Sequence, residues 1–128
     1  MTSPPPSPRE YAVDARSTEI FGRVMCSART HHFIIDGPVA NGCPGEELTP
    51  PEAFLSGVAA CGVELVQVIA REQAVPVQAV AVRMQAVVDR SRPVRPDVTV
   101  FNTVRMRFTL TGVPSDRAAG LIEQFKKR

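Results

Sequence analysis

Three cysteines are the residues of this chain with the most capacity for chemistry: Cys26, Cys43 and Cys61. A thiolate is a nucleophile that oxidises reversibly to a sulfenic acid, whereas a thiol packed among apolar side chains is inert. Cys61 lies among alanines and a glycine inside the longest apolar segment. Two interpretations therefore stay open, a reactive thiol approached by an arginine or a small hydrophobic residue of the core. An odd number of cysteines at unrelated spacings is a poor disulfide framework and favours a reducing, cytoplasmic location.

The element that positions Cys61 is a predicted helix over residues 53–74. Thr49 and Glu52 have the spacing of a capping box, with two prolines between them in the first turn. Behind them apolar residues recur every three or four positions until Pro76 stops the helix. At 1.5 Å per residue such a helix is about 35 Å long, more than a domain of this size needs for itself. Its length and its apolar first half predict a partner subunit.

The remaining elements predict a small α+β domain. Residues 11–36, including the apolar run Thr18–Phe21, read as a two- or three-stranded antiparallel meander. Residues 80–88 and 104–110 each alternate apolar and polar side chains, as half-buried strands of one sheet do. A second helix follows, with Leu121 and its apolar neighbours on one face. The order β-β-β-α-β-β-α indicates the α+β class.

Composition limits the function classes. The chain has 128 residues with 15 Lys and Arg, 13 Asp and Glu, and a net charge of +2, so neither an acidic tail nor a nucleic-acid-binding arm is expected. We see no apolar run of the roughly 18–20 residues that a membrane span needs, and expect no membrane segment. Residues 1–9 carry four prolines and predict a disordered leader before a single domain over residues 10–128.

Residues 49–61, TPPEAFLSGVAAC, resemble the hallmark helix of the OsmC/Ohr family, whose pattern is roughly TPxELLLAAxAAC. Residues 29–38 resemble the strand and turn before that family's glycine-rich loop, and residues 101–112 resemble its penultimate strand. The resemblance runs from about Phe21 to the C-terminus and keeps the order of elements. It implies an OsmC-like fold in which antiparallel strands surround a long Cys-bearing central helix, in an intertwined homodimer.

The resemblance also implies an activity, the reduction of organic hydroperoxides. In that chemistry the helix cysteine, here Cys61, becomes a sulfenic acid and a dithiol reductant restores it, without a cofactor. The implied site contains an arginine from the N-terminal strands, for which Arg29 is the better match and Arg23 the other candidate. The alternative is a non-peroxidase member of the fold whose dimer-interface pocket binds a small apolar molecule, with Cys61 in a structural role.

Glu52 is the remaining member of the candidate site. The peroxidase branch of the family has a glutamate ten residues before the cysteine, where this chain has Pro51. Glu52 stands nine residues before Cys61 and, at about 100° per residue, on the opposite face of the helix. Its capping role is therefore an alternative to a catalytic one.

The family's resolving cysteine and its closing strand would follow the second helix. The sequence ends at Arg128, before either of them. Either the protein lacks a resolving thiol or the C-terminal end is truncated here, and we expect the truncation, because a helix is an unusual last element for this fold.

A metal site is not expected. Cys26, His31, His32 and Cys43 match no common zinc-ligand spacing. The adjacent histidines of a strand point to opposite faces, so one is expected to face inward and one to face solvent.

Overall fold

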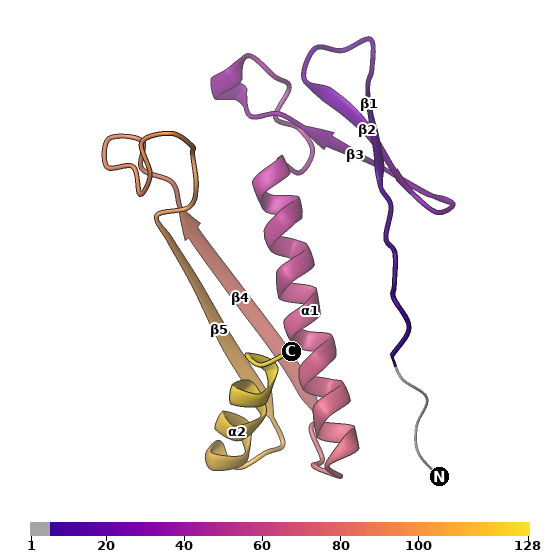
Figure 1. The fold of residues 1–128 in the computed structure, drawn as a ribbon, viewed down its shortest axis with the longest axis vertical. Coiled ribbons are helices and arrows are strands. Elements are labelled where there is room, and N and C mark those ends of the chain that lie inside the picture. The colour runs from indigo at the N-terminus through magenta and orange to yellow at the C-terminus, as the bar shows by residue number, and fades with distance from the viewer. Residues whose placement is uncertain (1–5) are drawn as a thin grey trace. The chain divides into compact units, whose positions relative to one another are not determined.

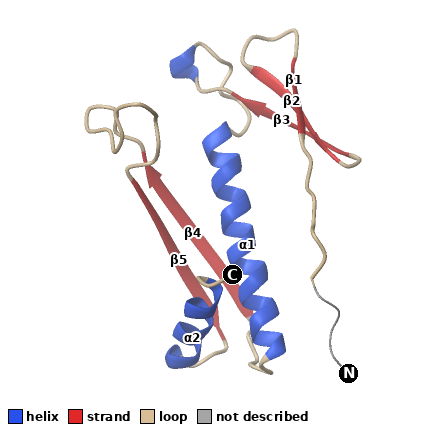
Figure 2. Cartoon of the chain, viewed as in Figure 1, coloured by secondary structure: helices blue, strands red, loops and turns tan. Residues whose placement is uncertain are grey.

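A computed structural model describes residues 6–128, in which mixed antiparallel strands and helices follow the predicted order (Figures 1 and 2). Two compact units divide the chain, one ending at Ala53 and one spanning Phe54–Arg128. Residues 1–5 of the predicted leader lie outside the described residues, and residues 6–9 are exposed and without regular secondary structure. The single domain over residues 10–128 stays a prediction.

The first unit is built on the predicted meander, which has three strands. β1 (Asp14–Ser17), β2 (Arg23–Ala28) and β3 (His31–Asp36) pair antiparallel in the order β1-β2-β3. The prediction that Thr18–Phe21 is strand is wrong. The hydroxyl of Thr18 accepts a hydrogen bond from the Ile20 amide and lies 3.0 Å from the Arg23 carbonyl oxygen, to which it donates. These bonds fold the segment into the turn that joins β1 to β2.

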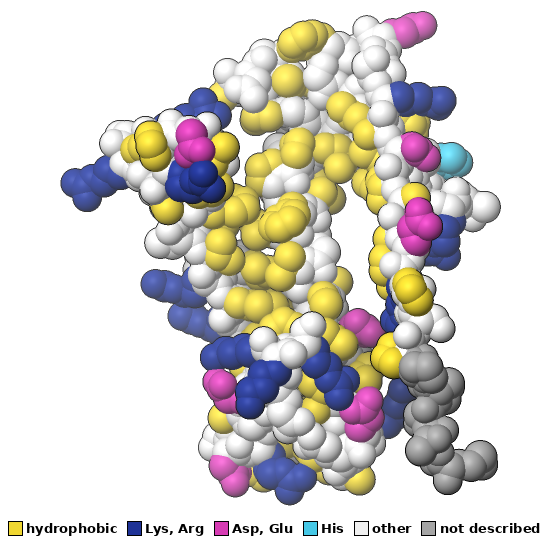
Figure 3. Space-filling model, viewed as in Figure 1, with side chains coloured by type: hydrophobic (Ala, Val, Ile, Leu, Met, Phe, Trp, Pro, Cys, Tyr) yellow, Lys and Arg dark blue, Asp and Glu magenta, His cyan; other side chains and the backbone are white. Residues whose placement is uncertain are grey.

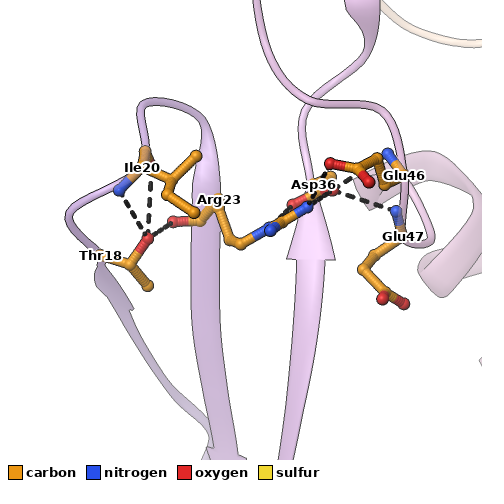
Figure 4. A network of polar contacts seen from close by, with 6 residues as sticks. All are labelled: Thr18, Ile20, Arg23, Asp36, Glu46 and Glu47. Atoms are coloured by element: carbon orange, nitrogen blue, oxygen red, sulfur yellow. Dashed lines mark hydrogen bonds and ion pairs between the residues drawn. The ribbon is translucent and has the colours of Figure 1, made fainter.

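An ion pair on a buried carboxylate joins β2 to β3, and the loop after β3 binds the same carboxylate (Figure 4). Asp36 is fully buried, and Arg23 clamps it with two hydrogen bonds, Nε to Oδ1 and a terminal nitrogen to Oδ2, each 2.8 Å. The backbone amides of Glu46 and Glu47 both donate to Oδ2 at 3.0 Å. The Arg23 guanidinium and these amides hold the pKa of the Asp36 carboxyl well below its usual range, although burial opposes this. One carboxylate thus binds both β2 and the loop after β3. A buried charge is tolerated only with such a full set of partners.

The long helix α1 (Pro50–Glu72) begins and ends with specific caps. Both the amide and the hydroxyl of Thr49 donate to one carboxylate oxygen of Glu52, at 3.0 and 2.7 Å, which confirms the capping box. The helix ends two residues before the predicted boundary because Ala74 adopts a left-handed conformation, φ 55°. The amide of Val75 then donates to the Ala70 carbonyl and that of Ala74 to the Arg71 carbonyl. This is a Schellman motif with alanine where glycine is usual.

In the second unit α1 packs on a two-stranded sheet. β4 (Ala79–Val87) and β5 (Thr103–Thr111) pair antiparallel. β4 alternates exposed and half-buried side chains as predicted, but in β5 the alternation begins at Met106, and the prediction that Val104 is half-buried is wrong because it is exposed. α2 (Ser115–Phe125) follows. The side chains that form the buried core come from α1, the segment after it and α2: Val66, Ile69, Ala70, Val75 and Leu121.

At Gly62 side chains of β5 pack directly against α1. A Cβ at this position would lie 2.5 Å from Met106 Cε and 3.2 Å from Phe108 Cζ. The end of the flexible Met106 side chain could move away from an added methyl group, whereas the Phe108 ring would have to shift by a few tenths of an ångström, so glycine allows the tight packing at this point.

The length and composition of α1 would allow it to cross a membrane, so the expectation that no segment reaches that threshold is wrong. Core helices of water-soluble proteins have the same length and composition. Val66, Ile69 and Ala70 of α1 belong to the core of the second unit, as expected of a core helix.

The cap of α1 predicts that Ala74→Gly stabilises the protein. A left-handed conformation costs an L-residue about 1–2 kcal/mol but costs glycine little, while glycine loses more backbone entropy on folding. We expect the free energy of unfolding to rise by about 0.5–1 kcal/mol in denaturant titrations. The matched control is Ala119→Gly in the exposed interior of α2, which should lower it by a similar amount. Equal losses in both variants would contradict the cap.

The buried ion pair predicts a pH-dependent stability that Asp36→Asn removes. The variant removes the buried carboxylate and leaves Arg23 only the exposed Glu46 as a charge partner, and we expect the Tm at pH 7 to fall by roughly 10 °C or more. Because folding lowers the pKa of Asp36, its contribution is full above about pH 4 and is lost as the pH falls below that value. The Tm difference between wild type and variant should therefore shrink in acid.

Asp97→Asn is the control for Asp36→Asn. Asp97 also accepts two hydrogen bonds from an arginine, Arg95, but both side chains are more than half exposed. Its loss should hardly change the Tm. Similar Tm losses in the two variants, or a difference for Asp36→Asn that does not respond to pH, would contradict the assignment.

Candidate functional site

Cys61 is exposed on α1. The next residue, Gly62, is buried against β5. The Cys61 thiol lies outside this contact. The helix is anchored further along by Val66 and Ile69 of the core. In this chain the thiol is therefore not sealed among aliphatic side chains, and it is held on a rigid element rather than on a loop.

Large apolar side chains also stay exposed around the N-terminal half of α1 and the ends of β4 and β5. Phe54 of α1 is 64% exposed and lies with its ring centroid 6.5 Å from that of Phe101. In the same unit the exposed valines are Val87, Val88, Val94, Val98, Val100 and Val104. Figure 3 shows hydrophobic side chains gathered along α1 and the strands beside it. Exposed apolar surface of this kind is typical of an interaction site.

The two arginine candidates differ in their surroundings. Arg23 is engaged by Asp36 and by Glu46, the latter at 3.2 Å, and these contacts raise the pKa of Arg23 above its usual value. Arg29 lies in the turn between β2 and β3, exposed and with φ 56°. It forms no ion pair within residues 6–128. Both belong to the first unit and Cys61 to the second, so an arginine beside the thiol stays a prediction.

Glu52 performs the capping role. The hydrogen bonds from the Thr49 amide and hydroxyl lower the pKa of the Glu52 carboxyl, so it is ionised at neutral pH. A carboxylate held in this way stabilises the start of α1.

The remaining cysteines and the histidines form no metal-binding cluster within the described residues. Cys26 is buried in β2, while the Cys43 side chain fills the space left free by two glycines, Gly22 and Gly37. His31 and His32 are both exposed, so the prediction that one faces inward is wrong. Within the described residues no three potential metal ligands lie together.

Asp36 is the functional residue of this unit that the sequence analysis missed, because it stands there only as the last residue of the predicted meander. Its signal was a charged residue at the end of the apolar run Phe33–Ile35. Strand pairing places Asp36 directly opposite Arg23, a partner that the meander alone could have suggested.

Comparisons with known proteins agree on the fold. The chain's sequence matches no curated protein. Among solved structures, an OsmC-like protein from Mycoplasma pneumoniae has a TM-score of 0.80 at 15% identity, covering 94% of this chain and 82% of that one. An OsmC-like protein of unknown function from Vibrio cholerae has a TM-score of 0.78 at 13% identity, covering 93% and 88%.

A further relative is an organic hydroperoxide resistance protein from Elizabethkingia anophelis, solved with thiocyanate derived from the crystallisation medium. Its TM-score is 0.75 at 14% identity, covering 94% of this chain and 84% of that one. At these identities the structures are similar in fold alone. The family model described as "OsmC-like protein" matches residues 43–128, which include α1 and all that follows it. The chain belongs to the OsmC-like protein family.

Proposed function

We propose that this protein reduces organic hydroperoxides through Cys61 and contributes to defence against oxidative stress. The observation that carries the proposal is the exposed thiol of Cys61 on the core helix. A peroxide-reducing thiol must be reachable by substrate and held in place, and a thiol buried like that of Cys26 is not reachable. Several structures of similar fold are organic hydroperoxide resistance proteins, which supports the same function.

The reaction consumes one hydroperoxide and one dithiol. The Cys61 thiolate attacks a peroxide oxygen, the O–O bond breaks, and the sulfur becomes a sulfenic acid while the alkoxide leaves and is protonated to the alcohol. An external dithiol then attacks the sulfenic sulfur and releases water, forming a mixed disulfide. The second thiol of the reductant attacks this mixed disulfide and displaces Cys61 as a thiolate. The reductant leaves as a cyclic disulfide. Two electrons thus pass from the dithiol to the peroxide, in a compartment such as the cytoplasm that keeps dithiols reduced.

The apolar surface around Phe54 supports two further parts of the proposal. Apolar walls favour an alkyl hydroperoxide over hydrated hydrogen peroxide. The same surface is exposed in one chain and would be covered in a homodimer. Of the two arginines, Arg29 is the one proposed to approach Cys61, because Arg23 is already bound by Asp36.

Replacement of Cys61 tests the proposal directly. Reduced protein would receive one equivalent of cumene hydroperoxide in the presence of dimedone, which traps sulfenic acids, and peptide mapping by mass spectrometry would locate the adduct. We expect the adduct on Cys61, with faster formation from cumene hydroperoxide than from hydrogen peroxide. Cys61→Ser should abolish it, while Cys26→Ser and Cys43→Ser should retain it.

Arg29→Ala in the same assay should slow trapping at Cys61 by roughly 10-fold or more, and Arg29→Lys should restore part of the rate. If Cys61 stays reduced while Cys26 or Cys43 is oxidised, the peroxidase proposal fails. The fold would then serve as a binding protein for a small apolar molecule, with Cys61 in a structural role.

A further inference from the structure

The outer face of the β4–β5 sheet carries three arginines and no carboxylate. Met106 and Phe108 of β5 pack against α1, so the residues that alternate with them project from the opposite face of the sheet. This outer face is formed by the odd-numbered positions of both strands, five in each, and all of them are exposed. None of these residues is an aspartate or a glutamate, and three are arginines: Arg83, Arg105 and Arg107. We call this surface the arginine face.

The positive charges of the arginine face are not compensated within the second unit. Arg107 stands directly opposite Arg83 in the strand pairing, and Arg105 stands opposite Gln85. None of the three arginines forms an ion pair in the part of the chain that the structure describes. Like charges at directly opposed positions destabilise a sheet. A partner that brings negative charge to this face would relieve the repulsion.

Positive charge is concentrated on this hairpin rather than spread over the chain. Residues 79–111 hold six arginines and two aspartates, a net charge of +4. The rest of the chain holds nine basic and eleven acidic residues, a net charge of −2. An acidic partner is therefore attracted to the hairpin and not to the protein as a whole.

The other side chains of the arginine face narrow the class of partner. No aromatic residue stands among its positions to stack on a nucleic-acid base. Val87 is its one large apolar residue, too little to anchor in a lipid surface. A single exposed pair of arginine and carboxylate is weak, so an open face of this kind suits a partner that carries several carboxylates.

The spacing of the arginines matches an extended polypeptide. Arg105 and Arg107 are alternate residues of one strand, and alternate residues of an extended chain are about 6.6–6.8 Å apart with their side chains on the same side. An extended segment with acidic residues at alternate positions has the same spacing between its carboxylates.

We propose that the arginine face docks an acidic partner protein, through an extended segment with carboxylates at alternate positions. Arg105 and Arg107 each bind one carboxylate, and Arg83 adds positive charge beside them. The contact lies on the side of the sheet away from α1 and involves no thiol chemistry. It does not rest on the proposed function of Cys61.

Fluorescence anisotropy with the intact chain and a labelled TETETET peptide tests the proposal. At about 0.1 M salt the Debye length is about 10 Å, so remote charges contribute little. We expect saturable binding that weakens as salt is added. The double variant R105Q/R107Q should bind about 10-fold more weakly or worse. The peptide TTEEETT, which has the same composition without the alternation, should bind wild type about threefold more weakly.

The double variant R71Q/R117Q is the matched control. It removes the same two charges from exposed helix positions of the same unit, where neither arginine forms an ion pair within residues 6–128. It should change the affinity by less than about twofold. R107Q alone should melt at or above the Tm of the wild type, because it removes the opposed pair with Arg83. This melt verifies that weaker binding does not come from unfolding.

Three kinds of result would overturn the proposal. Equal weakening by the two double variants would show that net charge alone attracts the peptide. Equal affinity for the two peptides would show that the alternate spacing plays no part. Tighter binding of an oligothymidylate of the same charge, or of phosphatidylglycerol vesicles, would identify a nucleic-acid or membrane surface instead of a protein-docking one.

Discussion

The close approach of α1 to β5 at Gly62 is the constraint on which the second unit depends. With no side chain at this position, Met106 and Phe108 fill the space under the helix, and the helix lies close to the strand. On the same helix Val66 and Ile69 are fully buried in the core, while Cys61, next to Gly62, is exposed. The tight packing at Gly62 and the exposed thiol of Cys61 thus belong to neighbouring positions of one helix.

In the first unit the main constraint is the attachment of a loop to a small sheet. Three strands and a long connection bury few apolar side chains, and Cys26 is the buried one among them. Asp36 compensates by joining the Arg23 guanidinium to two loop amides in one network. A buried carboxylate is stable only with such complete partners, which makes the network specific as well as stabilising. It also engages Arg23 fully, which leaves Arg29 as the candidate to act at the thiol.

Much of the fold was predictable because its signals are local. The capping box at Thr49 and Glu52 and the alternation along the strands depend on neighbouring residues. The structure confirms the capping box, the alternation of β4 and that of β5 from Met106 onward. The end of α1 was missed because alanine rarely adopts the left-handed conformation that closes it. The role of Arg23 was missed because its partner lies 13 residues away across a strand pair. The candidate thiol could be named from its motif, but its exposure depends on tertiary packing at Gly62.

The central claim, that Cys61 itself reduces the peroxide, is tested most directly by a single turnover without dithiol. A Cys26→Ser/Cys43→Ser double variant retains Cys61 as its sole thiol. Excess cumene hydroperoxide would be added to the reduced variant, and cumyl alcohol would be quantified by chromatography. The account predicts a rapid burst of about one alcohol per chain, matched by the loss of one titratable thiol. No burst above that of the Cys61→Ser protein would contradict it.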